Sequence, residues 1–468
     1  MKPQTQPASS PQSKTARHRS RTRRNSPPRN RLATPVEIPV RPSAPAFPEA
    51  DSRASRAELR LVPPQPEIAD LSPRDNEKFE RLVTAKPVKA PCAPCHWGLL
   101  VAAMLLAVLS IPLVYSASTA IALDQHGGNA DFFLSRQIGF ALFGFIGMIF
   151  ASRLSPAKVR NLTWILYGIA LGGLVMTKFS PLGFSMGNTE RWVKLGPLTL
   201  QFSELAKIAL IGVMADFWSR AARDSQKSIW PWIAAGVLVG MPLVLTFIQP
   251  HLSATIVLFV VPLAIAFYAG APRRHFGCIL GTLAVLGMVT LALCKTNSMP
   301  FLAPYQQQRI AAHLSGTSKD TAKTSHYQQD QGERALVRGG LTGVGLGASL
   351  YKQGHLPAPH TDFIYAVIGE EWGLVGTLGL LGLYGAVVFF CFQIGHSAHN
   401  SFDALLCSGV GTLLGVQAAG NIGVVSGMLP VTGMPLPILT YGGSGMICAL
   451  LGIGLVLAIS RSQCEEGE

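Results

Sequence analysis

Long apolar runs separated by short polar segments fill the chain from about residue 98 onward. A membrane-spanning helix needs about 20 mostly apolar residues, and about ten runs meet that length. They cover residues 98–123, 132–152, 161–178, 203–220, 229–248, 252–271, 276–294, 374–394, 404–427 and 444–460. The pattern therefore predicts an all-α polytopic membrane protein with about ten transmembrane helices.

Basic residues in the short connecting segments indicate how these helices are oriented. Lys and Arg are enriched in cytoplasmic loops. We therefore expect both termini to be cytoplasmic, with segments 179–202, 295–373 and 428–443 outside the membrane. The segment 295–373 is by far the largest of these and lies between helices 7 and 8. The basic residues that set this orientation are Arg153, Lys158, Arg160, Arg220, Arg223, Lys227, Arg273, Arg274 and Arg461.

The first 97 residues have a different composition from the rest of the chain. They hold 18 of the 39 Lys and Arg residues, 9 of the 25 Asp and Glu residues and 17 of the 33 prolines. Such a composition predicts a disordered, basic, proline-rich cytoplasmic tail. The tail either attracts anionic membrane lipid or is solvated and only fixes the topology. It is too long and polar for a secretory signal. Residues 98–461 then form the transmembrane domain, and 462–468 a short cytoplasmic tail.

Several other classes of site receive little support from the sequence. None of the eight cysteines forms a pair in an external segment, so we expect no disulfide framework. Cys92–His96 matches the C-x-x-C-H pattern of haem attachment, but the predicted topology puts it on the cytoplasmic side. The glycines at 339–347 lack the Gly-Lys-Ser/Thr of a nucleotide P-loop. We also expect no nucleic-acid partner.

The long outer segment 295–373 carries the most informative acidic residue. Loops beyond about 15 residues are usually functional or disordered. Asp362 lies within His360–Phe363, at the outer membrane boundary. A partly desolvated carboxylate has a raised proton affinity and can act as a general base. It could instead hold a divalent cation such as Mg²⁺ or Mn²⁺. Alternatively, Thr361 or Asp362 could be a helix N-cap.

Two further pairs of charged residues lie at predicted helix ends. Glu204 and Lys207 are spaced i, i+3 and can form an ion pair on one helix face. This pair either neutralises itself within the membrane or helps to shape a site. Glu370 and Glu371 stand at the start of the predicted helix 374–394. They either cap that helix, which its dipole favours, or shape the site.

The outer segments also carry basic residues, which suit a substrate that bears phosphate. Each of them, taken alone, could equally be a solvated surface charge. They are Arg191, Lys194, Arg309, Arg334, Arg338 and Lys352.

Taken together, these motifs resemble the SEDS family (shape, elongation, division and sporulation), whose members FtsW and RodA are peptidoglycan glycosyltransferases. Seven blocks carry the resemblance, in order along the predicted topology. They are Tyr115–Ser118, Arg191–Gly196, Gln201–Lys207, Gln249–Pro250, Gln308–Gly340, Lys352–Gly373 and Gly427–Ser444. The resemblance implies about ten helices and an essential aspartate, here Asp362.

The resemblance implies an enzyme that polymerises lipid II on the outer face of the bacterial plasma membrane. Asp362 would be the general base, with undecaprenyl pyrophosphate as the leaving group. A divalent cation is possible but not required. The expected substrate-binding residues are Arg191, Lys352, Arg338, His360, Thr361, Gln331, Gly339 and Gly340.

The family also implies partners and a place in the cell. A class B penicillin-binding transpeptidase, division proteins and membrane lipids are the expected partners. Tyr115–Ser118 and the long tail favour the division type, at the septum, over the elongation type. A lipid II flippase and a non-catalytic scaffold for a transpeptidase are the alternatives.

The chain departs from the family pattern at two informative positions. Phe202 stands where the family commonly has proline, which changes a helix start rather than a reacting group. His251 stands where the family has aspartate, which removes an acid near the site.

Overall fold

The computed structural model describes residues 96–125, 127–181, 183–186, 189–195, 198–282, 285 and 325–465. The predicted tail up to residue 95, with Cys92 and Cys95, therefore lies outside the described residues. So do the first part of the large outer segment, with Arg309, and residues 466–468.

Apolar helices dominate the described part of the chain. Within it, seven helices are long and apolar enough to cross a membrane. They are α3 (Trp97–Gln125), α4 (Phe132–Ser152), α5 (Pro156–Phe179), α7 (Trp230–Ile248), α12 (Ile364–His396), α13 (Ser401–Val425) and α14 (Gly443–Glu465). A multi-pass membrane fold is thus confirmed.

Three more predicted spans are not among these seven. Helix α6 (Phe202–Ala221) covers its predicted range in full but carries charged side chains such as Glu204 and Asp216, and α8 (Leu252–Tyr268) is 17 residues long. Residues 273–282 are helical, but most of the predicted span beyond them lies outside the described residues. A short 3-10 helix, η2 (Asp224–Gln226), follows α6, and α11 (Ser325–Gly339) lies in the large outer segment.

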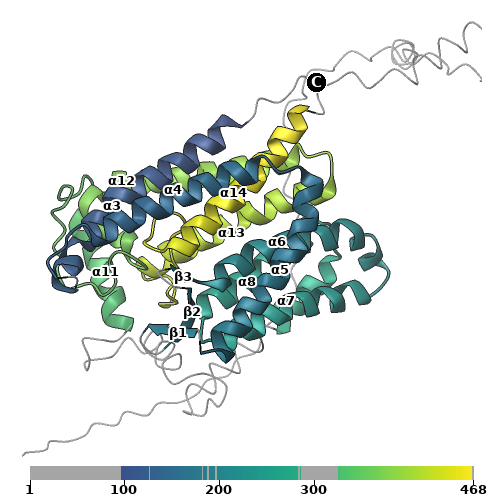
Figure 1. Ribbon diagram of the computed structural model, residues 1–468, viewed down its shortest axis with the longest axis horizontal. Helices are drawn as coiled ribbons and strands as arrows, with labels where there is room; N and C mark the ends of the chain where they lie inside the picture. Colours follow the sequence, from purple (N-terminus) through teal and green to yellow (C-terminus); the bar gives the residue numbers. More distant parts are fainter. Residues whose placement is uncertain are drawn as a thin grey trace, which may run out of the picture. The chain divides into compact units, whose positions relative to one another are not determined.

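Figure 1 shows the helices packed side by side, with α3, α4, α12, α13 and α14 together and α5–α8 beside them. Helix α13 contacts both α6 and α8 and so joins the two groups. The ends of distant helices meet at one end of the bundle. There His96 N donates to Ser460 Oγ at 3.4 Å, and Arg461 Nη2 to the Arg153 carbonyl at 3.3 Å.

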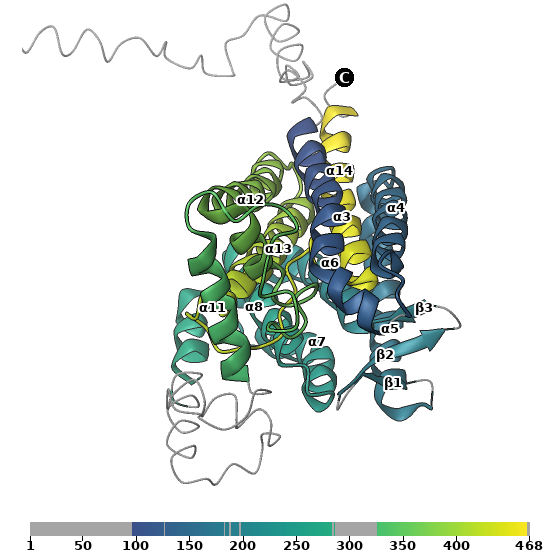
Figure 2. The ribbon, with the colours of Figure 1, turned by 90° about the vertical axis from the view of Figure 1, so that its left-hand side faces the viewer.

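The prediction of an all-α fold is wrong for the segment after α5, which the sequence predicts to lie outside the membrane. This segment forms a three-stranded antiparallel sheet of β1 (Gly183–Met186), β2 (Thr189–Leu195) and β3 (Leu198–Leu200). Val193 pairs with Gly183 and Leu200 and is fully buried. Figure 2 shows the sheet and α11 at the end of the bundle away from the C-terminus.

Helix α12 differs from its prediction in both its start and its course. It begins at Ile364 rather than at residue 374, so Glu370 and Glu371 lie inside it. The backbone leaves the helical region at Gly373, where φ is 66° and ψ is −162°. Only glycine adopts such dihedrals readily. The helix therefore has a break directly after its two glutamates.

Candidate active site

The segment before α12 holds Asp362 in place. Thr361 Oγ1 donates to the Ala358 carbonyl at 3.2 Å within a turn, and Phe363 occupies the N-cap of α12. The interpretation of Thr361 or Asp362 as the N-cap is therefore wrong. The Thr361 hydroxyl is engaged within the turn, and α12 starts beyond both residues.

Two distant segments converge on Asp362. Asn421 of α13 donates from Nδ2 to the Asp362 carbonyl at 2.8 Å and to the Met434 carbonyl at 2.7 Å. The Asp362 carboxylate lies against Gly433, where a Cβ would stand 3.2 Å from Oδ2. Ser253 Oγ in turn donates to the Gly433 carbonyl at 3.2 Å. The half-buried carboxylate thus sits on a floor fixed by α8 and α13.

The ring of His360 is packed into an aromatic cluster beside Asp362. Its centroid lies 4.8 Å from that of Phe133 and 5.7 Å from that of Tyr441. The His360 carbonyl also accepts from the Tyr441 backbone N–H at 2.9 Å. Burial lowers the pKa of His360 to about 4, so the ring is neutral at neutral pH. A neutral imidazole can bind a hydroxyl but does not supply positive charge.

His251, the departure from the family pattern, is buried next to the predicted cation Arg191. Arg191 Nη2 donates to the Pro250 carbonyl at 2.6 Å, and His251 Nδ1 lies 3.3 Å from Ser203 Oγ. Burial above all, and then the charges of Arg191 and Lys207, lower the pKa of His251 well below its usual range. This position therefore carries no charge, where an aspartate would carry a negative one.

Glu204 and Lys207 form the predicted ion pair. Lys207 Nζ lies 2.7 Å from Glu204 Oε1, and both side chains are buried. A cavity of about 20 Å³ adjoins Glu204, lined also by Gln417 and Thr440. This volume is sufficient for about one water molecule.

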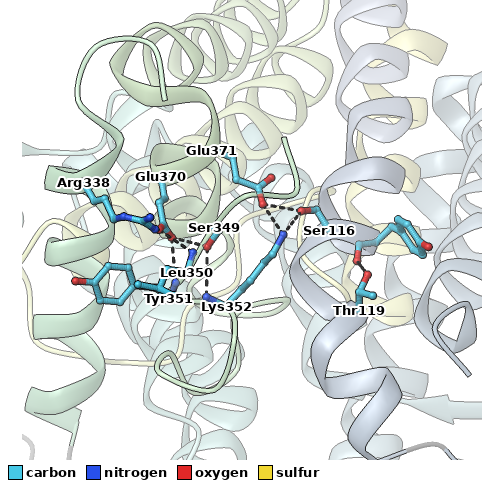
Figure 3. Close-up of polar contacts among 10 residues, drawn as sticks. Ser116, Thr119, Arg338, Ser349, Leu350, Tyr351, Lys352, Glu370 and Glu371 are labelled. Carbon is cyan, nitrogen blue, oxygen red and sulfur yellow. Dashed lines mark hydrogen bonds and ion pairs between the residues drawn. The ribbon is translucent and has the colours of Figure 1, made fainter. Parts of the chain in front are cut away.

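Glu370 and Glu371 do not cap the start of α12, contrary to one interpretation of the sequence, because the helix begins six residues before Glu370. Figure 3 shows Glu370 between Arg338 and the loop that follows α11. The Glu370 carboxylate accepts from Arg338 Nη1 and Ser349 Oγ. It also accepts from the backbone N–H groups of Leu350, at 2.9 Å, and Tyr351, at 3.3 Å.

The neighbouring carboxylate of Glu371 holds Lys352. Lys352 Nζ lies 2.7 Å from Glu371 Oε1 and 2.9 Å from Ser116 Oγ, and Ser116 also donates to Glu371 at 2.7 Å (Figure 3). The side chain of Lys352 is only 8% exposed and that of Glu371 is fully buried. The predicted cations Lys352 and Arg338 are thus each paired with a glutamate.

The remaining predicted substrate residues lie on α11 and at its end. Gln331 is buried in α11. Gly339 is packed so closely against the Gly369 carbonyl that a Cβ would collide with it, and Gly340 has a φ of 53°. Arg334 instead pairs with Asp330 on the helix surface. The structure therefore brings Gly339, Gly340, Arg338 and Lys352 together around the two glutamates.

Sequence reasoning missed Asn421 and Ser253, and it treated Ser116 only as part of a motif. An asparagine in the apolar helix α13 is itself a signal, because polar side chains within the membrane usually bond to another segment. Nothing in the spacing shows which segment that is.

Comparison with known proteins places this arrangement in a family. The family model for FtsW, RodA and SpoVE, described as a cell cycle protein, matches residues 96–465. The chain belongs to this family. The resemblance to the SEDS family stated from the motifs is thereby confirmed.

Members of the family are similar over most of their length. The probable peptidoglycan glycosyltransferase FtsW of Neisseria gonorrhoeae is 33% identical over 425 residues, covering 82% of this chain and 85% of that protein. Stage V sporulation protein E of Bacillus subtilis is 31% identical over 363 residues, covering 78% and 96%.

Two solved structures share the fold. One concerns the structural coordination of polymerization and crosslinking by a peptidoglycan synthase complex; it is 29% identical with a TM-score of 0.64, covering 78% of this chain and 98% of that one. The other is the Rod shape determining protein RodA of Thermus thermophilus, 27% identical with a TM-score of 0.56, covering 78% and 97%.

The donor set for a divalent cation is small. Within the described residues, no group of three or more His, Cys, Asp or Glu side chains could hold a metal ion. Mg²⁺ usually binds through one or two carboxylates, waters and substrate phosphates. Asp362 fits that kind of site, in which the substrate supplies the other ligands.

Proposed function

We propose that this chain is a peptidoglycan glycosyltransferase that polymerises lipid II into glycan strands during cell division. The observation that carries the proposal is the placement of Asp362. Asp362 is half-buried just before α12, with its carboxylate against Gly433 and its backbone carbonyl bonded to Asn421 of α13, in a member of the family of FtsW, RodA and SpoVE. Relatives across most of the chain are named peptidoglycan glycosyltransferases.

The full topology of the proposal has about ten spans, with both termini in the cytoplasm. The disordered tail 1–97 precedes the transmembrane domain 98–461, and the loop 295–373 faces outside. Contacts between the ends of different helices support this arrangement. His96 bonds Ser460, and Arg160 pairs with Asp216, so segments that carry basic loops meet at one end of the bundle. Asp362 and the sheet belong to the segments at the other end.

The chemistry assigned to the site is a displacement at the anomeric carbon of the donor lipid. The hydroxyl of an acceptor disaccharide attacks that carbon and loses its proton to the Asp362 carboxylate. A new glycosidic bond forms, the bond from carbon to the phosphate oxygen breaks, and undecaprenyl pyrophosphate leaves with its electrons. A carboxylate partly removed from water is suited to take the proton.

Positive charge must offset the charge that develops on the leaving pyrophosphate. Arg338 is 40% exposed while it pairs with Glu370, so its guanidinium can also bind a phosphate oxygen. Lys352 would act from its pair with Glu371, and Arg191 from beside Pro250. A divalent cation bound by Asp362 would neutralise the phosphates in addition to these residues.

The remaining predicted residues receive supporting roles. His360 and Thr361 flank the base, and the neutral His360 ring offers a hydrogen-bonding surface for a sugar. Gln331, Gly339 and Gly340 shape the end of α11 and the start of the loop that carries Lys352. Glu204 and Lys207 stabilise the floor of the site, and Glu370 and Glu371 anchor the loop.

The proposed partner is a class B penicillin-binding transpeptidase, together with other division proteins at the septum. The similarity to a chain in a peptidoglycan synthase complex supports such a partner. The division type is preferred over the elongation type on the strength of the relatives named FtsW.

Substitution of the base tests the proposal. Asp362→Asn in the purified full-length chain should reduce polymer formation from labelled lipid II by about 100-fold to 10,000-fold, the usual contribution of a general base. The matched control is Asp330→Asn, which removes an exposed acid from α11 in the same outer segment. It should polymerise normally.

The same preparation distinguishes the alternatives. A flippase would move labelled lipid II between leaflets of a vesicle without forming polymer. A scaffold would support cell division with Asn at 362. Normal polymer from the Asp362→Asn protein would refute the assignment of the base.

A further inference from the structure

The break in α12 exchanges helical hydrogen bonds for bonds to the loop after α11. In an unbroken α-helix, the N–H of Leu374 would bond to the Glu370 carbonyl and that of Val375 to the Glu371 carbonyl. Gly373 prevents this, because its dihedrals lie far from helical values. Two donors and two acceptors at the break therefore need other partners.

The loop supplies a partner for each of these groups. Val344 N donates to the Glu370 carbonyl at 3.0 Å, and Gly345 N to the Glu371 carbonyl at 3.1 Å. In return, Leu374 N donates to the Gly340 carbonyl at 2.9 Å, and Val375 N to the Leu341 carbonyl at 3.1 Å. The loop thus replaces both lost helical bonds, donor for donor and acceptor for acceptor.

Close packing of glycines makes this exchange possible. A Cβ on Gly343 would collide with the Glu371 carbonyl, and one on Gly373 would collide with the backbone of Gly343. Gly343 also has a φ of 80°. By contrast, Gly345 and Gly347 have open space where a Cβ would be. The contact therefore depends on Gly343 and Gly373 in particular.

The same break controls the side chains that hold the rest of the loop. Glu370 and Glu371, whose carbonyls receive the loop backbone, use their carboxylates to hold Leu350, Tyr351 and Lys352. Their position depends on where the helix breaks. The backbone bonds and the side-chain bonds that hold the loop therefore both depend on the break at Gly373.

We propose that Gly373 is a positioning residue for glycan polymerisation: the break at Gly373 fixes the loop 340–352, and through it Lys352, the proposed ligand of the leaving pyrophosphate. The expected effect on the rate rests on the proposed function, whereas the exchange of hydrogen-bond partners at Gly373 does not depend on it. A closed helix would satisfy Glu370 and Glu371 internally, so the loop can be released without leaving α12 unsatisfied. The break is thus an element with two alternative sets of partners.

Gly373→Ala tests the inference, since alanine favours the closed helix and disfavours the observed dihedrals. Hydrogen exchange in the full-length chain should show a specific asymmetry. Val344 and Gly345 should lose protection, whereas Leu374 and Val375 keep it through bonds to Glu370 and Glu371. The matched control is Gly379→Ala in the same helix, where a Cβ meets nothing within 4 Å.

The kinetic expectation is a fall in kcat of about 100-fold, typical of a displaced group, with a smaller change in KM. Loss of protection at all four amides, while the rest of α12 stays protected, would show that no exchange of partners takes place and would overturn the inference. Unchanged protection at Val344 and Gly345 would do the same.

A second variant changes the loop instead of the helix, and it serves if Gly373→Ala does not fold. Val344→Pro removes the donor to Glu370 and leaves α12 intact. Its control is Leu346→Pro, which is also preceded by a glycine and whose side chain is 62% exposed. Only Val344→Pro should lower the protection of Gly345 and the rate. Equal effects of the two prolines would contradict the inference. If Asp362→Asn still formed polymer, the assignment of the base would fail, whereas the exchange pattern at Val344 and Gly345 would still support the inference about Gly373.

Discussion

His360 makes the stability of the outer site dependent on pH. Its folded pKa of about 4 lies below the ordinary value of 6.5, so between these values the unfolded chain binds more protons than the folded one. Stability should therefore fall as pH drops through this window and level off below it. The shift corresponds to a loss of about 3 kcal/mol in the free energy of unfolding.

His360→Gln should flatten this dependence, measured as the midpoint of thermal unfolding in detergent across the same pH window. His355, which lies exposed in the same loop, provides the control, and His355→Gln should leave the dependence unchanged. A full pH dependence in the His360 variant would show that another group causes it.

Individual residues differ in how far their roles follow from sequence. The pairing of Glu204 with Lys207 follows from helical spacing alone, because i, i+3 neighbours share a face. The partners of Glu371 do not, since Ser116 lies 255 positions away along the chain. Asn421 likewise joins segments that nothing local connects. The spacing of residues along the chain predicts contacts within one helix or strand, but it does not predict contacts between elements.

At the scale of elements, the buried pair of Lys352 and Glu371 holds the loop to α12 and α3. Glu371→Gln leaves a buried ammonium without its counter-charge, which should lower the free energy of unfolding by about 3–5 kcal/mol. Lys352→Met combined with Glu371→Met removes both charges and should regain most of that loss. The double variant should nevertheless polymerise poorly, since Lys352 is a proposed ligand of the pyrophosphate.

The exposed pair of Asp330 and Arg334 on α11 is the comparison for this pair. Its side chains are 39% and 61% exposed, so Asp330→Asn should change stability by about 1 kcal/mol at most. Chemical unfolding of both sets of variants in one detergent gives the comparison. If the Glu371 and Asp330 variants were equally stable, the buried pair would not hold the loop. A fully active double variant would remove Lys352 from the site.

Elements that hydropathy predicts well are those whose apolar run is nearly continuous. Helix α4 was predicted to its last residue, because its single charged residue, Arg136, lies near its start and the 16 residues that follow carry no charge. The start of α12 was missed by ten positions, because Glu370 and Glu371 end the apolar run although both are buried and bonded. The sheet of β1–β3 was missed because its strands are short and pair only with each other.

Phe202 shows how one departure from the family pattern is absorbed by packing. Its ring lies on Gly173 of α5, where a Cβ would collide with it. Gly172 next to it has open space instead. The ring of Phe202 therefore fits at the start of α6 because Gly173, its neighbour on α5, has no side chain. A sequence pattern alone cannot show this compensation, because the two positions are 29 residues apart.

For the whole molecule, segments remote in sequence gather at the two ends of the bundle. At one end, Arg461 bonds the Arg153 carbonyl, Arg160 pairs with Asp216, and Arg274 bonds the Gln226 carbonyl at 3.5 Å. Asp362, Lys352 and the sheet belong to segments of the other end. The bundle thus separates basic loops from the site, as the proposed polymerisation on one face of the membrane requires.

This separation predicts which loops an impermeant thiol reagent can reach in intact cells. Two single cysteines, Leu346→Cys and Asp224→Cys, would be placed in a chain whose own cysteines have been replaced. Both positions are exposed, and neither removes a basic residue. Short basic loops remain in the cytoplasm, so the cysteine at 346 should react in intact cells and that at 224 only after permeabilisation. Reaction at 224 in intact cells would invert the orientation and place Asp362 on the face where the proposed lipid-linked polymerisation could not deliver its product to the wall.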